Sequence, residues 1–180
     1  MTKYYTGKGD NGTTGILSNR RVSKADKLIE SIGDLDELNS AIGVALAHVK
    51  DESVAKTLKS IQNELFILGA NIASTNDKKV EKAQVKPDAL KELEVAIGVL
   101  NEKTPELKEF VLPGGSLASA HLHLARAIAR RAERSVIAAS AGYTIADGVV
   151  PYLNRLSSYL FAAALYLNFN EKIEEAHPRY

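Results

Sequence analysis

The chain has 180 residues, and its 23 lysines and arginines nearly balance its 22 aspartates and glutamates. The formal net charge of +1 gives no global field that would attract a polyanion, so we expect no nucleic-acid partner. The absence of cysteine excludes disulfides, thiolate metal sites and thiol nucleophiles. Neither an apolar signal segment nor a run of about 18 apolar residues occurs, so we expect one cytoplasmic domain over residues 1–180 with no membrane span.

The N-terminal stretch, residues 1–22, is dense in glycine, threonine, asparagine and aspartate, which predicts an ordered loop rather than a helix or strand. Its segment TGKGDNGTTG offers unobstructed backbone N–H groups, hydroxyls and a lysine, the groups that cradle phosphates or a hydrated magnesium ion. The P-loop pattern GxxxxGK[ST] is absent and GxGxxG fits only loosely. Taken alone, the stretch therefore leaves a flexible terminus as the alternative.

Three helices are predicted after this loop. Apolar residues at spacings of three, four and seven predict a long helix over about residues 23–49, with Ser23 as its N-cap. A second apolar stripe predicts a helix over residues 58–72. A polar loop follows, and Pro87 is the expected first residue of a third helix over about residues 87–100.

Two further helices complete the prediction. The sequence PGG at residues 113–115 predicts a turn, after which Ser116 caps a fourth helix that runs to about residue 141. The fifth helix is expected over about residues 147–168, and the polar segment 171–180 is expected to be a frayed tail. Five helices joined by short to moderate loops predict an all-α bundle.

A row of arginines in the fourth helix is the clearest functional signal. Arg126, Arg130 and Arg134 recur every four residues, so they share one face and repel one another. Guanidinium groups bind phosphate oxygens through paired hydrogen bonds, so a polyphosphate laid along this face would turn the repulsion into binding. The alternative is a solvated face on which Glu133 pairs with Arg130.

Polar residues beside the apolar stripes of two other helices are further candidates. In GDLDELNSAIG, Asp36 and Ser40 share a face that suits packing against another subunit, where Asp36 would need a cationic partner. In YLNRLSSYLF, Asn154 can donate and accept hydrogen bonds, as recognition of adenine or ribose requires. Solvated side chains are the alternative at both places. His121 and His123 point to different sides of a helix and do not form the i, i+4 pair that binds zinc, so no metal site is predicted.

In order and spacing, these motifs resemble those of the PduO-type ATP:cob(I)alamin adenosyltransferases. The matching segments are YTGKGDNGTTG, GDLDELNSAIG, FVLPGG, ARAIARRAERSV and YLNRLSSYLF, and they cover about residues 4–161. The resemblance implies a five-helix bundle assembled as a homotrimer, with ATP and cobalamin bound in clefts between subunits and residues 1–22 as the nucleotide-binding loop. It implies transfer of the 5′-deoxyadenosyl group of ATP to cob(I)alamin, with release of triphosphate and with Mg²⁺ accompanying ATP.

The resemblance also implies roles for individual residues. Asp36 would meet Arg126 across the subunit interface, and these two with Arg130 would be the catalytic groups. Phe110 would lie against the lower face of the corrin. One subunit would bind ATP through a set of residues in and near the N-terminal loop: Thr6, Gly7, Lys8, Gly9, Asp10, Thr14, Gly15 and Lys24. The other would hold the triphosphate, magnesium and adenosine through Arg130, Arg131, Glu133, Arg134 and Asn154.

Two positions depart from the family's pattern. Gly7 stands where the family's loop has a lysine, and Lys8 follows it, so Lys8 is expected to contribute only if its ammonium group reaches the phosphates from this shifted place. Ser158 stands where the family has an acid, so this position supplies no charge.

The motifs leave two alternatives to the enzyme. A non-catalytic escort that delivers adenosylcobalamin to a mutase would use the same residues for binding. A structural helical trimer would leave the glycine-rich loop and the arginine row unexplained. For the enzyme itself, a reductase and an adenosylcobalamin-dependent mutase are the further partners expected.

Overall fold

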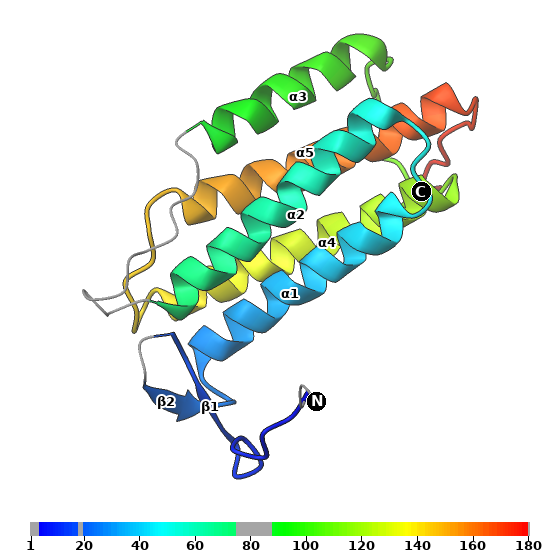
Figure 1. Cartoon of the computed structure of the whole chain (residues 1–180). Helices are drawn as coiled ribbons and strands as arrows, with labels where there is room; N and C mark the ends of the chain where they lie inside the picture. The colour runs from blue at the N-terminus through cyan, green and yellow to red at the C-terminus, as the bar shows by residue number, and fades with distance from the viewer. Residues whose placement is uncertain (1–3, 18–19, 75–87, 180) are drawn as a thin grey trace.

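The computed structural model describes residues 4–17, 20–74 and 88–179, which form a bundle of five helices with a short hairpin at one end (Figure 1). The helices are α1 (Lys27–Leu46), α2 (Glu52–Ala73), α3 (Ala89–Lys103), α4 (Leu117–Ala139) and α5 (Val149–Asn170). α1 packs against α2 and α4, α4 packs against α5, and α5 packs against α3. The predicted all-α five-helix bundle is confirmed. Within the described residues, no helix has both the length and the apolar character needed to cross a bilayer.

α4 and α5 form the centre of the core. The inward face of α4 carries small side chains, among them Ala125, Ala129 and Ala132, all 0 % exposed. Small side chains let packed helices approach closely, because the side chains at the contact set the distance between the axes. α5 is apolar on most of its circumference and contributes buried residues such as Leu153 and Leu160. This packing fixes α4 firmly, and with it the arginines on the helix's other side.

The helix boundaries follow from local capping. α1 begins after Asp26, whose carboxylate accepts the N–H of Leu28 at 2.9 Å. The prediction of Ser23 as N-cap is therefore wrong, because Ser23 is paired in a strand and the capping carboxylate comes three residues later. Ser116 does cap α4, where its hydroxyl oxygen accepts the N–H of Ser119 at 3.2 Å.

Strands β1 (Thr13–Gly15) and β2 (Arg21–Ser23) pair antiparallel within the predicted loop. A loop without strands was predicted here, and this part of the prediction is wrong. Three residues are too few to show the alternation of apolar and polar side chains that identifies a strand in a sequence. The hairpin gives the N-terminal loop a fixed base beside α1.

Other boundaries also differ from the prediction. α2 begins at Glu52, six residues before the predicted start, because Asp51 caps it by accepting the N–H of Val54 at 2.9 Å. α4 ends at Ala139 instead of residue 141, and α5 covers Val149–Asn170 instead of residues 147–168. The predicted polar loop and Pro87 fall almost wholly on residues 75–87, outside the described part of the chain.

The C-terminal tail, residues 171–179, is not frayed as predicted. It turns back at Lys172, whose φ is 57°, and its backbone is hydrogen-bonded to other parts of the chain. The N–H of Ile173 donates to the carbonyl oxygen of Asn168 at 2.9 Å, and the N–H of Leu112 donates to that of Ala176 at 2.7 Å. A polar composition does not reveal such backbone pairing.

Candidate active site

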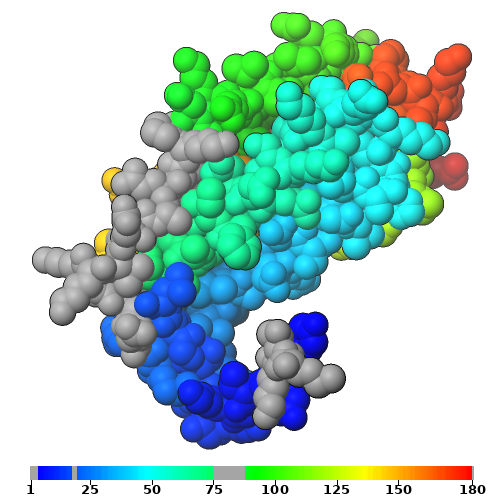
Figure 2. Space-filling model, in the orientation of Figure 1, coloured from blue at the N-terminus to red at the C-terminus, as the bar shows by residue number. Residues whose placement is uncertain are grey.

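The glycine-rich loop before the hairpin is a series of tight turns. Gly7 and Gly12 have φ values of +70° and +80°, in the left-handed region that glycine adopts without strain. The N–H of Asp10 donates to the carbonyl oxygen of Gly7 at 3.3 Å, and the N–H of Gly12 donates to that of Gly9 at 3.1 Å. Successive turns of this kind present backbone N–H groups toward an anion. In the space-filling view, the described part of the loop projects beyond the helices (Figure 2).

Lys24, which was predicted to bind ATP, lies beside this loop. Its backbone N–H donates to the carbonyl oxygen of Gly12 at 2.9 Å. A Cβ added at Gly9 would lie 3.2 Å from the Thr13 carbonyl oxygen and 3.3 Å from the Lys24 Nζ, so a larger residue there would displace one of them slightly. The loop thus holds a cation and backbone N–H groups together.

A groove of about 620 Å³ lies between α4, α5 and the segment before the PGG turn. Arg126 and Arg130 line it from α4, Ser158 and Phe161 line it from α5, and Phe110 lines it from the segment. Lys108 and Glu109 also line it. Residues from three separate parts of the sequence therefore meet at one groove, which combines three basic side chains and one acidic side chain with two aromatic rings.

Arg126 is held in this groove by its surroundings. Its Cζ lies 5.6 Å from the centre of the Phe161 ring, a cation–π distance. Its Nε is buried and has no hydrogen-bond partner within the described residues. One turn earlier on α4, burial and the charge of Arg126 lower the pKa of His123, which keeps that ring neutral. Half-buried Arg126 therefore offers a hydrogen-bond donor to an acceptor that lies outside the described residues.

Phe110 is 81 % exposed, so it is not a residue of the bundle core. Exposure of a whole aromatic ring beside a groove costs the free energy of its hydration, and such a ring is typical of a binding surface. Asp36 is also exposed, on α1. Within the described residues no ion pair joins it to Arg126.

The other residues of the predicted arginine face separate into two groups. Arg130 and Arg134 are exposed on α4. Arg131 instead turns to α1, where its Nε lies 3.1 Å from Asp34 Oδ1 and its Nη2 bonds Glu37. Arg131 is thus paired with carboxylates of the same chain, a contact that the sequence did not predict.

Glu133 is bonded across the helices. Its Oε1 accepts a hydrogen bond from the Asn154 Nδ2 on α5 at 3.1 Å. The alternative pairing of Glu133 with Arg130 does not occur among the described ion pairs. Two residues predicted to serve one nucleotide, from α4 and α5, are therefore in contact.

The comparisons with known proteins agree on one family. A family model described as cobalamin adenosyltransferase matches residues 4–167. The corrinoid adenosyltransferase of Bacillus subtilis (strain 168) is 43 % identical over 170 residues, which span 92 % of this chain and 86 % of the relative. A corrinoid adenosyltransferase of Citrobacter freundii is 38 % identical over 179 residues, 99 % of this chain and 98 % of the relative. This chain belongs to the cobalamin adenosyltransferase family.

A solved structure extends the agreement to the fold. A variant of the PduO-type ATP:corrinoid adenosyltransferase from Lactobacillus reuteri, complexed with cobalamin and ATP, matches with a TM-score of 0.94 and 32 % identity. The match covers 99 % of this chain and 100 % of that chain. The family and the enzyme class predicted from the motifs are confirmed.

Two residues that hold the glycine-rich loop and its junction with α1 were not predicted from the sequence. Arg21 in β2 anchors the glycine-rich loop, because its Nη2 donates to the carbonyl oxygen of Lys8 at 2.6 Å and to Thr13 Oγ1 at 2.7 Å. Tyr143, between α4 and α5, donates its hydroxyl to Asp26 Oδ2 at 2.8 Å, and this hydrogen bond raises the pKa of Tyr143. Neither residue stands in a recognisable motif, and only the folded chain brings them to the loop and its junction with α1.

Proposed function

We propose that this chain transfers the 5′-deoxyadenosyl group of ATP to the cobalt of cob(I)alamin and releases triphosphate. The observation that carries the proposal is the groove in which Arg126 and Arg130 face the exposed ring of Phe110. The arginines suit a polyanion that leaves, and the ring suits the apolar face of a corrin. Membership of the cobalamin adenosyltransferase family supports the same reaction.

In the proposed reaction the electron pair of cobalt(I) attacks C5′ of ATP. A cobalt–carbon bond forms, the bond between C5′ and its oxygen breaks, and triphosphate leaves with that bond's electron pair. No proton is transferred at carbon, so the protein needs no general acid or base there. Its contributions are the alignment of cobalt with C5′ and the stabilisation of the leaving charge. Arg130 and Arg134, with their guanidinium groups exposed on α4, supply the second contribution.

We propose a nucleotide site shared by two subunits of a homotrimer. One subunit supplies the projecting loop with its turns and Lys24, through Thr6, Gly7, Lys8, Gly9, Asp10, Thr14 and Gly15. Its neighbour supplies the arginine face with Glu133 and Asn154. In this arrangement Asp36 of one subunit meets Arg126 of the next. The contact is supported by the fact that neither group has an ion-pair partner within the described residues.

The surface of α1 and α4 also favours a neighbouring subunit. Val44 on α1 is 47 % exposed, and Leu117 and Leu124 on α4 are 64 % and 54 % exposed. Apolar side chains exposed on two helices that pack together are typical of a surface that another chain covers. We propose that Arg131, bonded to Asp34 and Glu37, holds α1 beside α4 in this arrangement and does not itself bind phosphate.

Magnesium fits this site as the companion of ATP. Within the described residues, no cluster of three or more histidine, aspartate or glutamate side chains could enclose a metal ion. Mg²⁺ is commonly held by substrate phosphates and one or two carboxylates, and Glu133 is the only acidic residue of α4. When bound, the ion would neutralise part of the triphosphate charge.

Phe110 would occupy the position below the corrin, exclude the lower axial ligand and water from cobalt, and so ease reduction of cob(II)alamin. A reductase that supplies the electron, a mutase that uses the product and a cytoplasmic location complete the proposal. The need for reduced cobalt supports the reductase, and the formation of adenosylcobalamin supports the mutase.

Triphosphate release tests the proposed reaction. Purified protein is mixed with ATP, magnesium and chemically reduced cob(I)alamin, and triphosphate is measured together with the spectrum of the cobalt–carbon product. We expect repeated turnovers with equal amounts of both products. Tight binding of both substrates without turnover would contradict the enzyme and favour the escort.

A further inference from the structure

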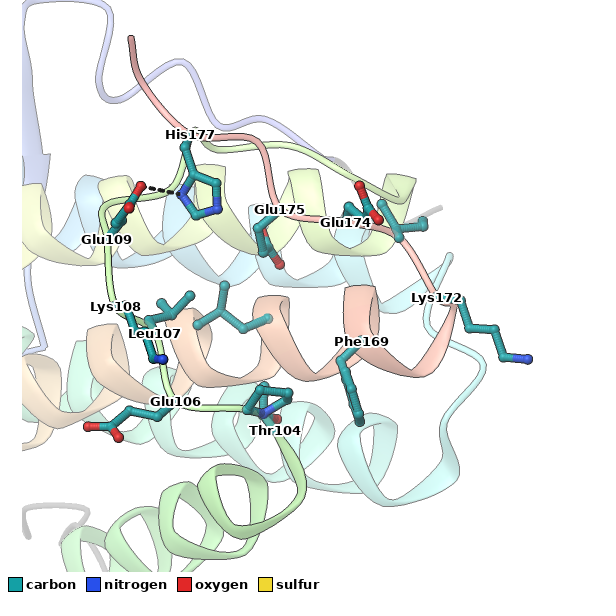
Figure 3. Close-up of a pocket in the computed structure, with 13 residues that line it drawn as sticks. Thr104, Glu106, Leu107, Lys108, Glu109, Phe169, Lys172, Glu174, Glu175 and His177 are labelled. Atoms are coloured by element: carbon teal, nitrogen blue, oxygen red, sulfur yellow. Dashed lines mark ion pairs between the residues drawn. The ribbon is translucent and has the colours of Figure 1, made fainter. Parts of the chain in front are cut away.

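The C-terminal tail runs beside the segment that carries Phe110. Figure 3 shows the tail above this segment, with His177 close to Glu109, and their side chains are 3.9 Å apart. The family model ends at residue 167, so the tail lies beyond the part of the chain that the family model matches.

Two hydrogen bonds join the tail to the segment on either side of Val111. His177 Nδ1 lies 2.9 Å from the carbonyl oxygen of Phe110. Because a carbonyl oxygen only accepts, Nδ1 carries the hydrogen. The N–H of Leu112 donates to the carbonyl oxygen of Ala176 at 2.7 Å. The backbone at Phe110 is therefore held by residues near the end of the chain.

The root of the tail is fixed to the bundle by Asn168, a buried residue of α5. Its Nδ2 donates to the carbonyl oxygen of Gly114 at 3.2 Å and to Glu175 Oε1 at 3.0 Å. Its Oδ1 accepts the N–H of Ser116 at 3.1 Å. The Asn168 side chain thus connects the PGG turn, the start of α4 and the tail. The tail is therefore fixed to the bundle and can hold the Phe110 segment in place.

Packing alone does not hold the Phe110 segment in place. A second cavity, of about 650 Å³, lies between the segment, the tail and the end of α5, where Leu165 and Phe169 contribute to its lining. Residues 107–109, which Figure 3 shows at the edge of this cavity, also line the Phe110 groove. A segment between two cavities lacks the close contacts that fix a core residue. Its position therefore depends on the hydrogen bonds to the tail.

We propose that His177 is a positioning residue that sets the place of Phe110 beneath the corrin. The inference rests on the proposed role of Phe110. Without the hydrogen bond from His177, the segment would shift toward the second cavity. The ring would then exclude the lower ligand less well. Chemistry that starts from cob(I)alamin does not need this exclusion, so only the route from cob(II)alamin should suffer.

Three variants of the full-length enzyme test the proposal. His177→Ala removes the donor, His177→Asn keeps an N–H donor near the position of Nδ1, and Glu174→Ala changes an exposed tail residue outside these hydrogen bonds. The spectrum of cob(II)alamin bound with ATP gives the four-coordinate fraction. Adenosylation is measured from cob(II)alamin with a chemical reductant and, separately, from cob(I)alamin.

We expect His177→Ala to lower the ratio of four- to five-coordinate cob(II)alamin about threefold to tenfold, the factor that matches one net hydrogen bond. The cob(II)alamin rate should fall with it, while the cob(I)alamin rate and the melting temperature stay within error. His177→Asn should restore most of the loss, and Glu174→Ala should match the wild type. An unchanged ratio in His177→Ala, or equal losses on both routes without rescue by asparagine, would overturn the proposal.

Phe110→Ala, measured in parallel, separates this inference from the proposed function. If Phe110→Ala abolishes the four-coordinate signal and His177→Ala does not change it, only the role of His177 is wrong. If Phe110→Ala itself leaves the signal unchanged, the proposed role of Phe110 fails, and the inference fails with it.

Discussion

The two walls of the groove are built in different ways. Arg126 and Arg130 project from α4, whose opposite face is packed through buried alanines against the rest of the bundle. Phe110 projects from a segment with cavities on both sides, held by hydrogen bonds to a distant tail. The charged wall is therefore carried by a helix of the packed core, whereas the apolar wall is placed by a few polar contacts. Because the proposed reaction uses both walls, substitutions in each should have different effects.

The largest effect is expected at the charged wall. Arg130→Ala should lower turnover from cob(I)alamin about 100-fold, because removal of one preorganised donor to a developing charge commonly costs that much. ATP affinity, measured by calorimetry, should also fall. The helical fold should stay intact, and loss of one charge from a repelling row can raise the melting temperature slightly.

Arg155→Ala is the control for this change, since it removes another partly exposed arginine, one paired with Glu94 at 3.0 Å between α5 and α3. Its turnover should stay close to that of the wild type. Unchanged ATP affinity in Arg130→Ala would mean that this face of α4 is not the phosphate site.

At the apolar wall, Phe110→Ala should affect one route only. Adenosylation that starts from cob(II)alamin should fall at least about tenfold, which corresponds to an activation free energy raised by about 1.4 kcal/mol. Cob(I)alamin should react at nearly the normal rate. Because the ring is 81 % exposed, its removal should leave the melting temperature nearly unchanged. A core phenylalanine would instead cost about 3–5 kcal/mol. A collapse of the fold, or full activity from cob(II)alamin, would each reject the corrin-facing role.

The turn at the base of the apolar wall offers a smaller effect with a matched control. Gly115 has φ +96°, and a Cβ there would collide with the Asn168 side chain. Gly115→Ala should cost about 1–3 kcal/mol of stability from backbone strain alone. The cob(II)alamin route should weaken several-fold because the Phe110 segment loses its anchor.

Gly114→Ala has nothing within 4 Å of the added Cβ and no positive φ, so its melting temperature should stay close to the wild-type value. Equal melting temperatures for the two alanine variants would contradict both the strain at Gly115 and the collision of an added Cβ with Asn168.

The smallest predicted effect concerns the junction between the glycine-rich loop and α1. Tyr143→Phe removes the hydrogen bond to Asp26, whose other carboxylate oxygen caps α1. The loop's base should loosen, and the KM for ATP should rise about threefold, in line with one net hydrogen bond. The ratio of four- to five-coordinate cob(II)alamin should not change, because Phe110 lies on another segment. A change in that ratio without a change in KM would contradict the prediction that Tyr143 affects ATP binding by the loop and not the position of Phe110.

How far the sequence predicts the molecule differs between the same two walls. The arginine row and the helix that carries it are visible because a helical period repeats over many residues. The apolar stripes predicted the first two helices for the same reason, whereas proline, glycine and capping residues marked the others. Phe110 was found only through the family resemblance, since a lone phenylalanine before a turn has no period, and its exposure depends on the tertiary fold.

The features that the sequence did not predict depend on contacts between residues that are far apart in the sequence. Asn168 at the end of α5 lies 54 residues from Gly114, and His177 of the tail lies 67 residues from Phe110, so no local pattern indicates these two contacts. Arg131 stands in the same motif as Arg130, but the carboxylates of α1 determine which way it turns. Ser23 and Asp26 are both good caps, and strand pairing at Ser23 decides between them.

The site shared between subunits is the central claim, and mixing two inactive variants tests it most directly. Lys24→Ala damages the loop, and Arg130→Ala damages the arginine face, so neither homotrimer should turn over at a significant rate. After subunits are exchanged in an equal mixture, about one interface in four of a cyclic trimer should combine an intact loop with an intact arginine face. We predict that triphosphate release returns to about that fraction of the wild-type rate. If each subunit holds a complete site of its own, every site in the mixture keeps one lesion, and no recovery after proven exchange would contradict the shared site.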